Sequence, residues 1–221
     1  MLPKFEALEA VKNAGVVAVV RGRSEENSYK ISKASIEGGV KAIELAFTSP
    51  NADVTIKRLS EEYADDSSVV VGAGTVLDPA TARMAMIAGA KFIVSPSYNE
   101  EVAELCNLYC VPYMPGCFTP SEVQKALSTG ADVIKIFPGA IATQKMIPEL
   151  QGPFPQANIM PSGGVSLDNM AEWFKAGAFV VGAGGSLVGP GADGDYAQVK
   201  ENAQKFHAEF ERIQKAGMGQ N

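Results

Sequence analysis

The stretch GADVIKIFP, residues 130–138, decides how the fold is interpreted. It places a glycine before a short run of mostly β-branched residues and ends in proline, which is typical of a strand that follows a helix and leads into a loop. Lys135 stands in the middle of this apolar run. A charged side chain inside a strand needs a partner or a task, because burial of an unpaired charge is costly.

The same pattern of helix end, glycine, small residue and strand occurs four times along the chain. The four copies are IEGGVKAIEL (36–45), MIAGAKFIVS (86–95), LSTGADVIKI (127–136) and FKAGAFVVGA (174–183). Their shared glycines, Gly39, Gly89, Gly130 and Gly177, are 50, 41 and 47 residues apart. A glycine that ends a helix in the left-handed conformation is enough to explain these four positions. The separations also indicate about two strand–helix units per copy.

Short apolar runs alternate with amphipathic stretches, and eight of these runs are expected to be strands. They are residues 16–21, 42–47, 68–74, 92–96, 112–116, 132–138, 158–164 and 179–185. Helix starts are indicated by Asp78 before a proline and by the capping box from Thr119 to Glu122. Residues 3–14 are expected to form an extra N-terminal helix. The chain, residues 1–221, is therefore predicted to be one α/β domain, a (β/α)8 TIM barrel, with a doubly wound open sheet as the alternative.

The composition is that of a soluble globular chain. Apolar residues make up 46% and charged residues 20%, and the net charge is −6 without a basic run, so nucleic acid is not an expected partner. No apolar run reaches the roughly 18–20 residues of a membrane helix. The opening residues, with Glu6 and Glu9, lack the basic start of a signal peptide. Three clustered cysteines, Cys106, Cys110 and Cys117, are typical of reduced thiols in a cytoplasmic protein.

The repeat predicts a buried lysine–glutamate pair. Five residues beyond the repeat glycines stand Glu44, Val94, Lys135 and Gly182. One interior layer of a barrel takes its side chains from alternate strands, so Glu44 and Lys135 are expected to face one another. A dry interior disfavours the charged lysine; its amine would then attack a ketone while the carboxylate moves protons. A structural ion pair is the alternative. Lys91 precedes its strand and is expected at the opposite end.

Glycine-rich turns follow the last two expected strands, at 161–164 and 182–186. Loops at these positions of a barrel often bind phosphate, because backbone N–H groups approach an anion closely where side chains are absent. Tight-turn geometry is the alternative interpretation. Leu77 and Leu187 occupy the third glycine position of a dinucleotide-binding pattern, so binding of a nucleotide cofactor is not supported.

Four further residues are expected at the site. Arg21 ends the first strand and is the best-placed cation for a substrate carboxylate, with a solvated arginine as the alternative. Thr75 is a hydrogen-bond donor for the same carboxylate or a helix cap. Pro96 and Phe137 are expected to be pocket walls or ordinary packing. His207, the only histidine, falls in the final helix, and no metal site or hydrolase set is expected.

A series of motifs resembles the 2-keto-3-deoxy-6-phosphogluconate (KDPG) / 4-hydroxy-2-oxoglutarate (KHG) aldolase family of class I aldolases. The motifs run in order from about residue 15 to 188: GVKAIELAF, VGAGTVL, FIVSP, MPGCFTPSE, DVIKIFPG, PSGGV and GAGGSLV. The resemblance implies a homotrimeric (β/α)8 barrel that needs no metal or other cofactor. It implies cleavage of KDPG to pyruvate and glyceraldehyde 3-phosphate, a reaction of carbohydrate metabolism in the Entner–Doudoroff pathway.

The resemblance also implies a role for each site residue. Lys135 matches the Schiff-base lysine and Glu44 the general acid/base. The pyruvate end would be lined by Thr75, Pro96 and Phe137, and the phosphate would be surrounded by Gly163, Gly164, Gly185 and Ser186. Ser162, in PSGGV, keeps the hydroxyl of the PTGGV found in many relatives.

One position departs from the pattern of the family. Many members carry an arginine four residues beyond the glutamate, where this chain has Thr48. Arg21 resembles the arrangement in a branch that includes the phosphogalactonate aldolases, and we infer that it takes over anion binding. Cleavage of the galactonate epimer or of KHG therefore stays an alternative. An orotidine-type decarboxylase would need Asp soon after Lys135, where residues 136–138 are Ile-Phe-Pro. A non-catalytic sugar-phosphate-binding barrel is the remoter alternative.

Overall fold

The computed structural model describes residues 2–217; Met1 and residues 218–221, which the single-domain prediction includes, lie outside them. The described chain is an α/β protein with curled parallel sheets. Its strands are β1 (Val16–Val20), β2 (Ala42–Ala46), β3 (Val70–Gly74), β4 (Ile93–Val94), β5 (Tyr113–Met114), β6 (Gly116–Cys117), β7 (Ile134–Ile136), β8 (Ile159–Pro161) and β9 (Val181–Ala183). One sheet has the order β5-β4-β3-β2-β1-β9 and the other β6-β7-β8.

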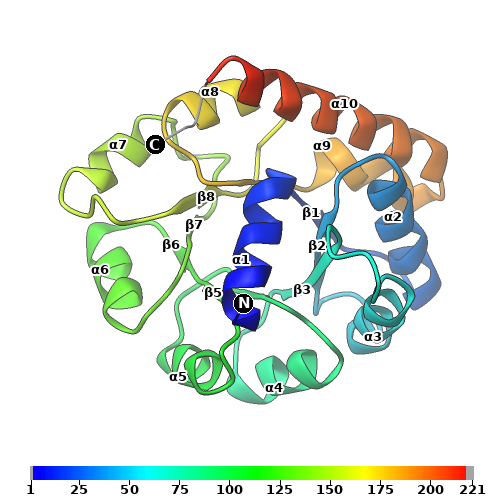
Figure 1. Ribbon diagram of the computed structural model, residues 1–221, viewed down its shortest axis with the longest axis horizontal. Helices are drawn as coiled ribbons and strands as arrows, with labels where there is room; N and C mark the ends of the chain where they lie inside the picture. Colours follow the sequence, from blue (N-terminus) through cyan, green and yellow to red (C-terminus); the bar gives the residue numbers. More distant parts are fainter. Residues whose placement is uncertain (1, 218–221) are drawn as a thin grey trace.

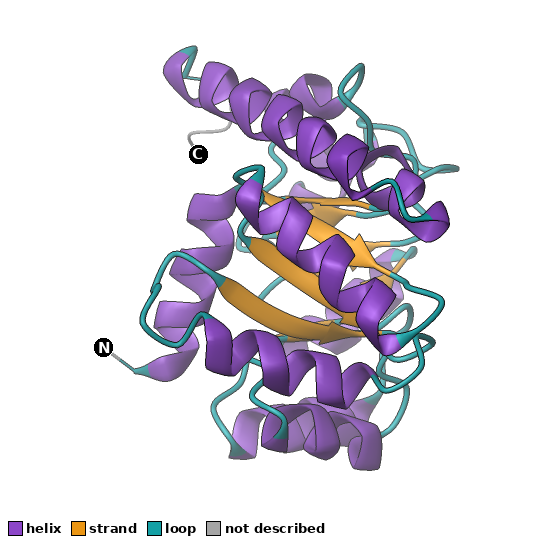
Figure 2. Ribbon diagram, turned by 90° about the vertical axis from the view of Figure 1, so that its right-hand side faces the viewer, coloured by secondary structure: helices purple, strands orange, loops and turns teal. Residues whose placement is uncertain are grey.

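Helices surround the strands. They are α1 (Pro3–Ala14), α2 (Glu25–Glu37), α3 (Ala52–Glu62), α4 (Pro79–Ile87), α5 (Glu100–Leu108), α6 (Pro120–Ser128), α7 (Met146–Gln151), α8 (Met170–Lys175), α9 (Gly185–Val188), the 3₁₀ helix η1 (Gly189–Asp193) and α10 (Tyr196–Lys215). Figure 1 shows them as a ring, with α1 lying across the strands in the middle of the view. Figure 2, turned by 90°, shows the strands enclosed between helices. The predicted N-terminal helix over 3–14 is confirmed.

The two sheets are connected at both ends. The expected strand at 112–116 is divided at Pro115, which has no N–H to donate, so that β5 pairs with β4 and β6 pairs with β7. On the other side, the Phe179 N–H donates to the Ile159 carbonyl oxygen at 2.8 Å, and one isolated parallel bridge links the ends of β8 and β9. These contacts bring the three-stranded sheet against both edges of the six-stranded one.

Alternate residues of each strand pack on opposite faces of the sheets, as a period of two requires. Ile134 and Ile136 lie in the larger apolar cluster with the helices, whereas Val133 lies in a smaller cluster on the inner face. The inner cluster draws on α1 and on both sheets: Val11, Val17, Ala42, Val70, Phe92, Val94, Met114, Val133, Met160 and Val180. The predicted alternation around Lys135 is therefore confirmed for its apolar neighbours.

The local signals for helix ends are also confirmed. Asp78 caps α4 by accepting a hydrogen bond from the Thr81 N–H at 2.8 Å, and Thr119 and Glu122 form the reciprocal capping box of α6. The four repeat glycines have φ between +82° and +106°, a range that L-residues rarely adopt. Each repeat therefore turns from helix to strand by the same geometry.

Two further features bear on the chemistry of the chain. Within residues 2–217, no helix is both long and apolar enough to cross a membrane. The three cysteines are free thiols. Burial raises the pKa of Cys106 and of Cys117 to about 12, so neither thiol ionises readily near neutral pH.

Candidate active site

A cavity of about 580 Å³ opens where the strands end. All the residues predicted for the site line it: Arg21, Glu44, Thr75, Pro96, Lys135, Phe137, Ser162, Gly163, Gly164, Gly185 and Ser186. Parallel strands bring their carboxyl ends to one edge, which gathers these distant positions. The sequence reasoning missed Val19, Val165, Ser166, Val188, Gly189 and Ala192, which also line the cavity, whereas Gly184 belongs to the predicted turn at 182–186. These are mostly small or apolar residues, and their nearness to predicted residues was the available signal.

Lys135 and Glu44 meet inside this cavity. The Lys135 Nζ lies 3.4 Å from the Glu44 Oε1, and the two side chains are 6% and 1% exposed. The Glu44 Oε2 is buried and has no hydrogen-bond partner among the residues described. A carboxylate with one unsatisfied oxygen beside a buried amine is suited to accept and return protons. The Lys135 Nζ also lies 5.3 Å from the centre of the Phe137 ring, which walls the amine on one side.

The backbone of β3 makes room for the carboxylate. A Cβ at Gly74 would overlap the Glu44 side chain, so glycine at this position permits the close approach. Thr75 follows with φ of +55°, a conformation uncommon for a non-glycine residue and one that clusters at functional sites. The cap of α4 is Asp78 rather than Thr75, which corrects the helix-cap alternative. The signal for Gly74 was a glycine at the end of an apolar strand.

Arg21 reaches the cavity as an exposed cation. Its guanidinium makes no ion pair or hydrogen bond with any residue from 2 to 217. The loop that carries it is held by a hydrogen bond from the Gly22 N–H to the Ser49 Oγ at 3.1 Å. Thr48 is exposed and is not part of the cavity lining. The arginine in the cavity lining thus follows β1, and the position after β2 supplies none.

The two glycine-rich turns lie at the same edge of the cavity. Gly163 and Gly164 have φ of +91° and +76°, and a Cβ at Gly184 or Gly185 would meet no atom within 4 Å. The open space lets an anion approach the backbone. The Ser186 hydroxyl donates to the Val165 carbonyl oxygen at 2.6 Å, so its proton is directed away from any ligand in the cavity.

A second, larger cavity of about 720 Å³ lies at the other ends of the strands, beside α1. It is lined by Lys41 and Lys91, which precede β2 and β4, and by His207 of α10. It contains none of the predicted site residues, and Lys91 is therefore on the side where the sequence places it. Within the described part of the chain, no group of three or more His, Cys, Asp or Glu side chains is arranged to hold a metal ion.

The fold and the cavity define an α/β enzyme with an amine beside a buried acid. Similarity to known proteins identifies the family of this enzyme. The model of the KDPG and KHG aldolase family matches residues 8–202, and the chain belongs to this family. It is 36% identical to the 2-dehydro-3-deoxy-phosphogluconate aldolase of Treponema pallidum (strain Nichols), over 93% of this chain and 96% of that protein.

Two other relatives widen the comparison. The 2-dehydro-3-deoxy-6-phosphogalactonate aldolase of Escherichia coli (strain K12) is 33% identical over 78% of this chain and 83% of its own length. The KDPG aldolase of Legionella pneumophila, solved with pyruvate captured as a covalent carbinolamine intermediate, superposes with a TM-score of 0.81 at 25% identity, over 92% of this chain and 97% of that one. This chain is an aldolase and a lyase of carbon–carbon bonds.

Proposed function

We propose that this chain is a class I aldolase that cleaves KDPG to pyruvate and glyceraldehyde 3-phosphate. The observation that carries the proposal is the buried contact of 3.4 Å between the Lys135 Nζ and the Glu44 Oε1, at the bottom of a cavity edged by glycine-rich turns. The names of the relatives at 36% and 34% identity support the substrate.

The proposed reaction begins with the amine. Lys135 passes a proton to Glu44 and adds to the C2 ketone, giving a carbinolamine; Glu44 returns the proton as the C2 oxygen leaves as water, which gives an iminium. Glu44, directly or through a water, then removes the C4 hydroxyl proton. The C3–C4 bond breaks, the aldehyde forms, and the electron pair moves to the iminium as an enamine. Protonation at C3 and hydrolysis release pyruvate and restore the amine.

The ends of the substrate carry negative charge, and the cavity has a suitable group for each. Arg21 supplies a free guanidinium for the C1 carboxylate, and Thr75 a hydroxyl for the same group. Pro96 and Phe137 enclose the pyruvate half. The C6 phosphate would lie against the backbone of 162–164 and 184–186, and the glycines at 184 and 185 leave open space beside the backbone for it. Because the Ser186 hydroxyl is bonded to Val165, we assign its contribution to the backbone N–H.

The galactonate epimer is a second candidate substrate, and one observation favours it. The cavity takes its cation from Arg21, as the resemblance to the phosphogalactonate aldolases implies, and Thr48 lies outside the lining. The two epimers differ at C4, whose hydroxyl loses the proton, so discrimination depends on contacts around Glu44. KHG, which has no phosphate, is the third candidate.

We also propose the larger context of this enzyme. The two sheets would form one (β/α)8 barrel in which β5 and β6 are a single strand interrupted at Pro115, supported by the inner apolar cluster shared by both sheets. Residues 1–221 would be a single domain that assembles as a homotrimer. Exposed apolar side chains on α4 and α5, including Ile87 and Leu108, give such an assembly a surface to bury. Free thiols support a cytoplasmic location, and the substrate supports a place in the Entner–Doudoroff pathway.

The experiment that tests the proposal is covalent capture. The protein is incubated with pyruvate and borohydride, digested and weighed. A stable pyruvyl adduct on Lys135 is expected, because borohydride reduces the iminium to an amine. Binding of pyruvate without an adduct would favour a sugar-phosphate sensor and refute the aldolase. The kcat/KM for the gluconate-derived, galactonate-derived and unphosphorylated substrates then decides between the three candidates.

A further inference from the structure

The rim of the active-site cavity is built from two segments that are far apart in the sequence. One is the loop after β1, residues 21–24, which carries Arg21. The other is residues 188–192, which comprise the end of α9 and most of η1 and are called the η1 wall here; Val188, Gly189 and Ala192 line the cavity. Neither residues 21–24 nor residues 189–192 belong to the motifs that resemble the aldolase family.

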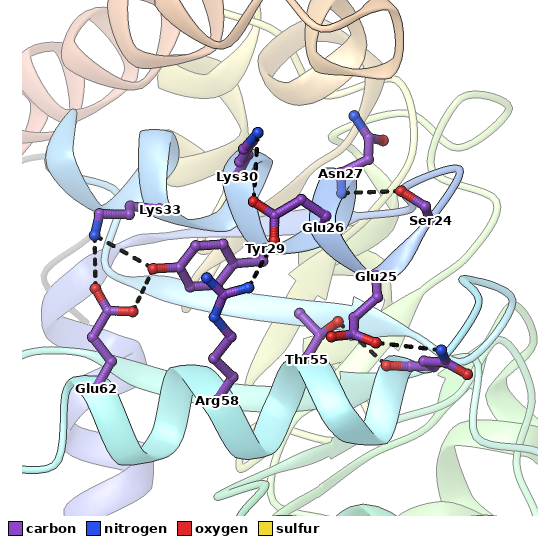
Figure 3. Close-up of polar contacts among 11 residues, drawn as sticks. Ser24, Glu25, Glu26, Asn27, Tyr29, Lys30, Lys33, Thr55, Arg58 and Glu62 are labelled. Carbon is purple, nitrogen blue, oxygen red and sulfur yellow. Dashed lines mark hydrogen bonds and ion pairs between the residues drawn. The ribbon is translucent and has the colours of Figure 1, made fainter.

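The Asn27 side chain makes this link. It is half-buried in the first turn of α2, and its Oδ1 accepts a hydrogen bond from the Arg23 N–H at 3.0 Å. Its Nδ2 donates to the Gly191 carbonyl oxygen at 2.8 Å and to the Tyr196 Oη at 3.0 Å. Figure 3 shows Asn27 projecting from α2 on the side away from α3. One amide therefore bonds the loop that carries Arg21, the η1 wall and the start of α10.

Two other contacts join the same segments. The Arg23–Asp193 ion pair spans 2.9 Å, but its side chains are 70% and 78% exposed, and such a pair contributes little. Gly191 packs on α2 so closely that an added Cβ would lie 2.5 Å from the Ile31 Cγ1. Packing holds Gly191 near α2 but does not orient its carbonyl group. The hydrogen bond from the Asn27 amide is directional and fixes that orientation.

We propose that Asn27 is a positioning residue that holds the η1 wall at a set distance from Arg21 and so determines how tightly a substrate with a negative group at each end is bound. This inference rests on the proposed function. The C1 carboxylate is assigned to Arg21 and the phosphate to the turns at 162–164 and 184–186. Because α9 runs from Gly185 directly into η1, a shift of the η1 wall relative to Arg21 displaces the 184–186 turn and weakens binding of the whole molecule. Pyruvate keeps the C1 carboxylate assigned to Arg21 but lacks the phosphate end, so its binding does not depend on the distance between Arg21 and the η1 wall.

The test is Asn27→Asp, which keeps the shape of the side chain and the oxygen that accepts from Arg23. The two Nδ2 bonds are lost, and an oxygen faces the Gly191 carbonyl oxygen instead. Loss of these bonds frees the η1 wall, so KM for the phosphorylated substrate is expected to rise about 10-fold. The kcat and the pyruvate concentration that half-saturates borohydride trapping are expected to stay within about twofold.

Three further variants keep the test decisive. Asn107→Asp is the matched control, because the Asn107 Nδ2 donates to the Thr129 carbonyl oxygen at 2.7 Å outside the cavity; its kinetics are expected to be unchanged. Tyr196→Phe removes one acceptor of the Asn27 amide and is expected to raise KM by a smaller factor. Asn27→Gln keeps an amide at this position, and its KM is expected to lie between those of the wild type and Asn27→Asp. If Asn27→Asp lowers the folded fraction, Tyr196→Phe decides.

The outcomes separate this inference from the proposed function. An unchanged KM in Asn27→Asp and Tyr196→Phe overturns the positioning role. An equal loss of substrate cleavage and pyruvate trapping also overturns it, because such a loss indicates a general structural role. A wild-type protein that neither cleaves the phosphorylated substrates nor traps pyruvate refutes the aldolase proposal instead. A rise in KM with trapping unchanged supports both.

Discussion

Two of the lysine–glutamate pairs that join different elements have different surroundings, and the surroundings give them different properties. Lys135 and Glu44 meet at 3.4 Å with side chains 6% and 1% exposed. Lys33 of α2 and Glu62 of α3 meet at 2.8 Å with side chains 40% and 31% exposed. The shorter contact is on the surface, and the longer one is in the cavity.

The surface pair belongs to a network in which every group has a partner (Figure 3). The Tyr29 hydroxyl donates to Glu62 at 2.6 Å, and the Arg58 guanidinium lies 3.3 Å from the centre of the Tyr29 ring. The hydrogen bond to Glu62 raises the pKa of Lys33, so this amine stays protonated and is no nucleophile. The hydrogen bond from Lys33, followed by that from Tyr29, lowers the pKa of Glu62.

The comparison indicates that a short salt bridge is a poor sign of a reactive lysine. Reactivity needs an amine that can lose its proton, an acid that can take it, and space for a substrate. The Glu44 Oε2 has no partner among the described residues, and the pair opens on a cavity; the Lys33–Glu62 pair is fully engaged. Burial with incomplete pairing distinguishes the candidate catalytic pair.

The largest expected effect is the loss of covalent chemistry in Lys135→Ala. Without the amine no iminium forms, so turnover should fall by a factor on the order of 10⁴–10⁶. Lys33→Ala should keep kcat within about twofold. Steady-state cleavage assays and the mass of the pyruvate–borohydride product measure both. A pyruvyl adduct that persists in Lys135→Ala would show that another amine forms the iminium and that Lys135 does not differ from Lys33 in this respect.

Glu44→Gln is expected to have the next largest effect. The amide keeps the shape of the side chain but does not accept a proton, so kcat should fall roughly 10²–10⁴-fold, the range for a general acid–base group. Glu62→Gln serves as the matched control and should leave kcat unchanged. Circular dichroism monitors the fold of both variants. Wild-type turnover in Glu44→Gln would return this residue to a structural ion pair.

Tyr29→Phe should act on stability alone. The variant loses the hydrogen bond to Glu62, and the free energy of unfolding should fall by about 1 kcal/mol. Urea unfolding measures the change, and cleavage assays should match those of the wild type. A fall in kcat would mean that the α2–α3 network influences the cavity.

The smallest effect is a pH dependence at Glu62. Because its folded pKa is lower than its ordinary value, its stabilisation is fully present above that ordinary value and is lost as the pH falls through the folded pKa. The difference in urea midpoint between the wild type and Glu62→Gln should therefore narrow from neutral pH to about pH 3. A constant difference would show that the charge of Glu62 contributes nothing, consistent with its partial exposure.

Much of the fold and the site was accessible from local patterns. The repeat glycines Gly39, Gly89, Gly130 and Gly177 mark equivalent turns, and counting from them selected Glu44 and Lys135. This worked because backbone conformation at a helix end and alternation along a strand depend on neighbouring residues. The break at Pro115 between β5 and β6 was not predicted, because the pairing of a strand with two different neighbours is a long-range property.

Asn27 and Gly74 illustrate what local patterns do not contain. Both looked ordinary in the sequence, as a polar residue in the first turn of a helix and as a glycine ending a strand. Asn27 gained its importance from Gly191, 164 positions away, and Gly74 from the Glu44 carboxylate on the neighbouring strand. Such contacts depend on how distant segments pack, and no short window of sequence records them.

Sequence reasoning was therefore sufficient for the alternation of strands and helices, the helix caps, the pairing of Lys135 with Glu44, and the cavity that they line. These properties follow from the local period of the backbone and from the cost of burying charge. The packed chain was required to reveal the 3.4 Å contact, the unpartnered oxygen of Glu44 and the bonds that hold the rim. Distances between side chains on separate elements are set by packing of the whole core, in which every element constrains the others.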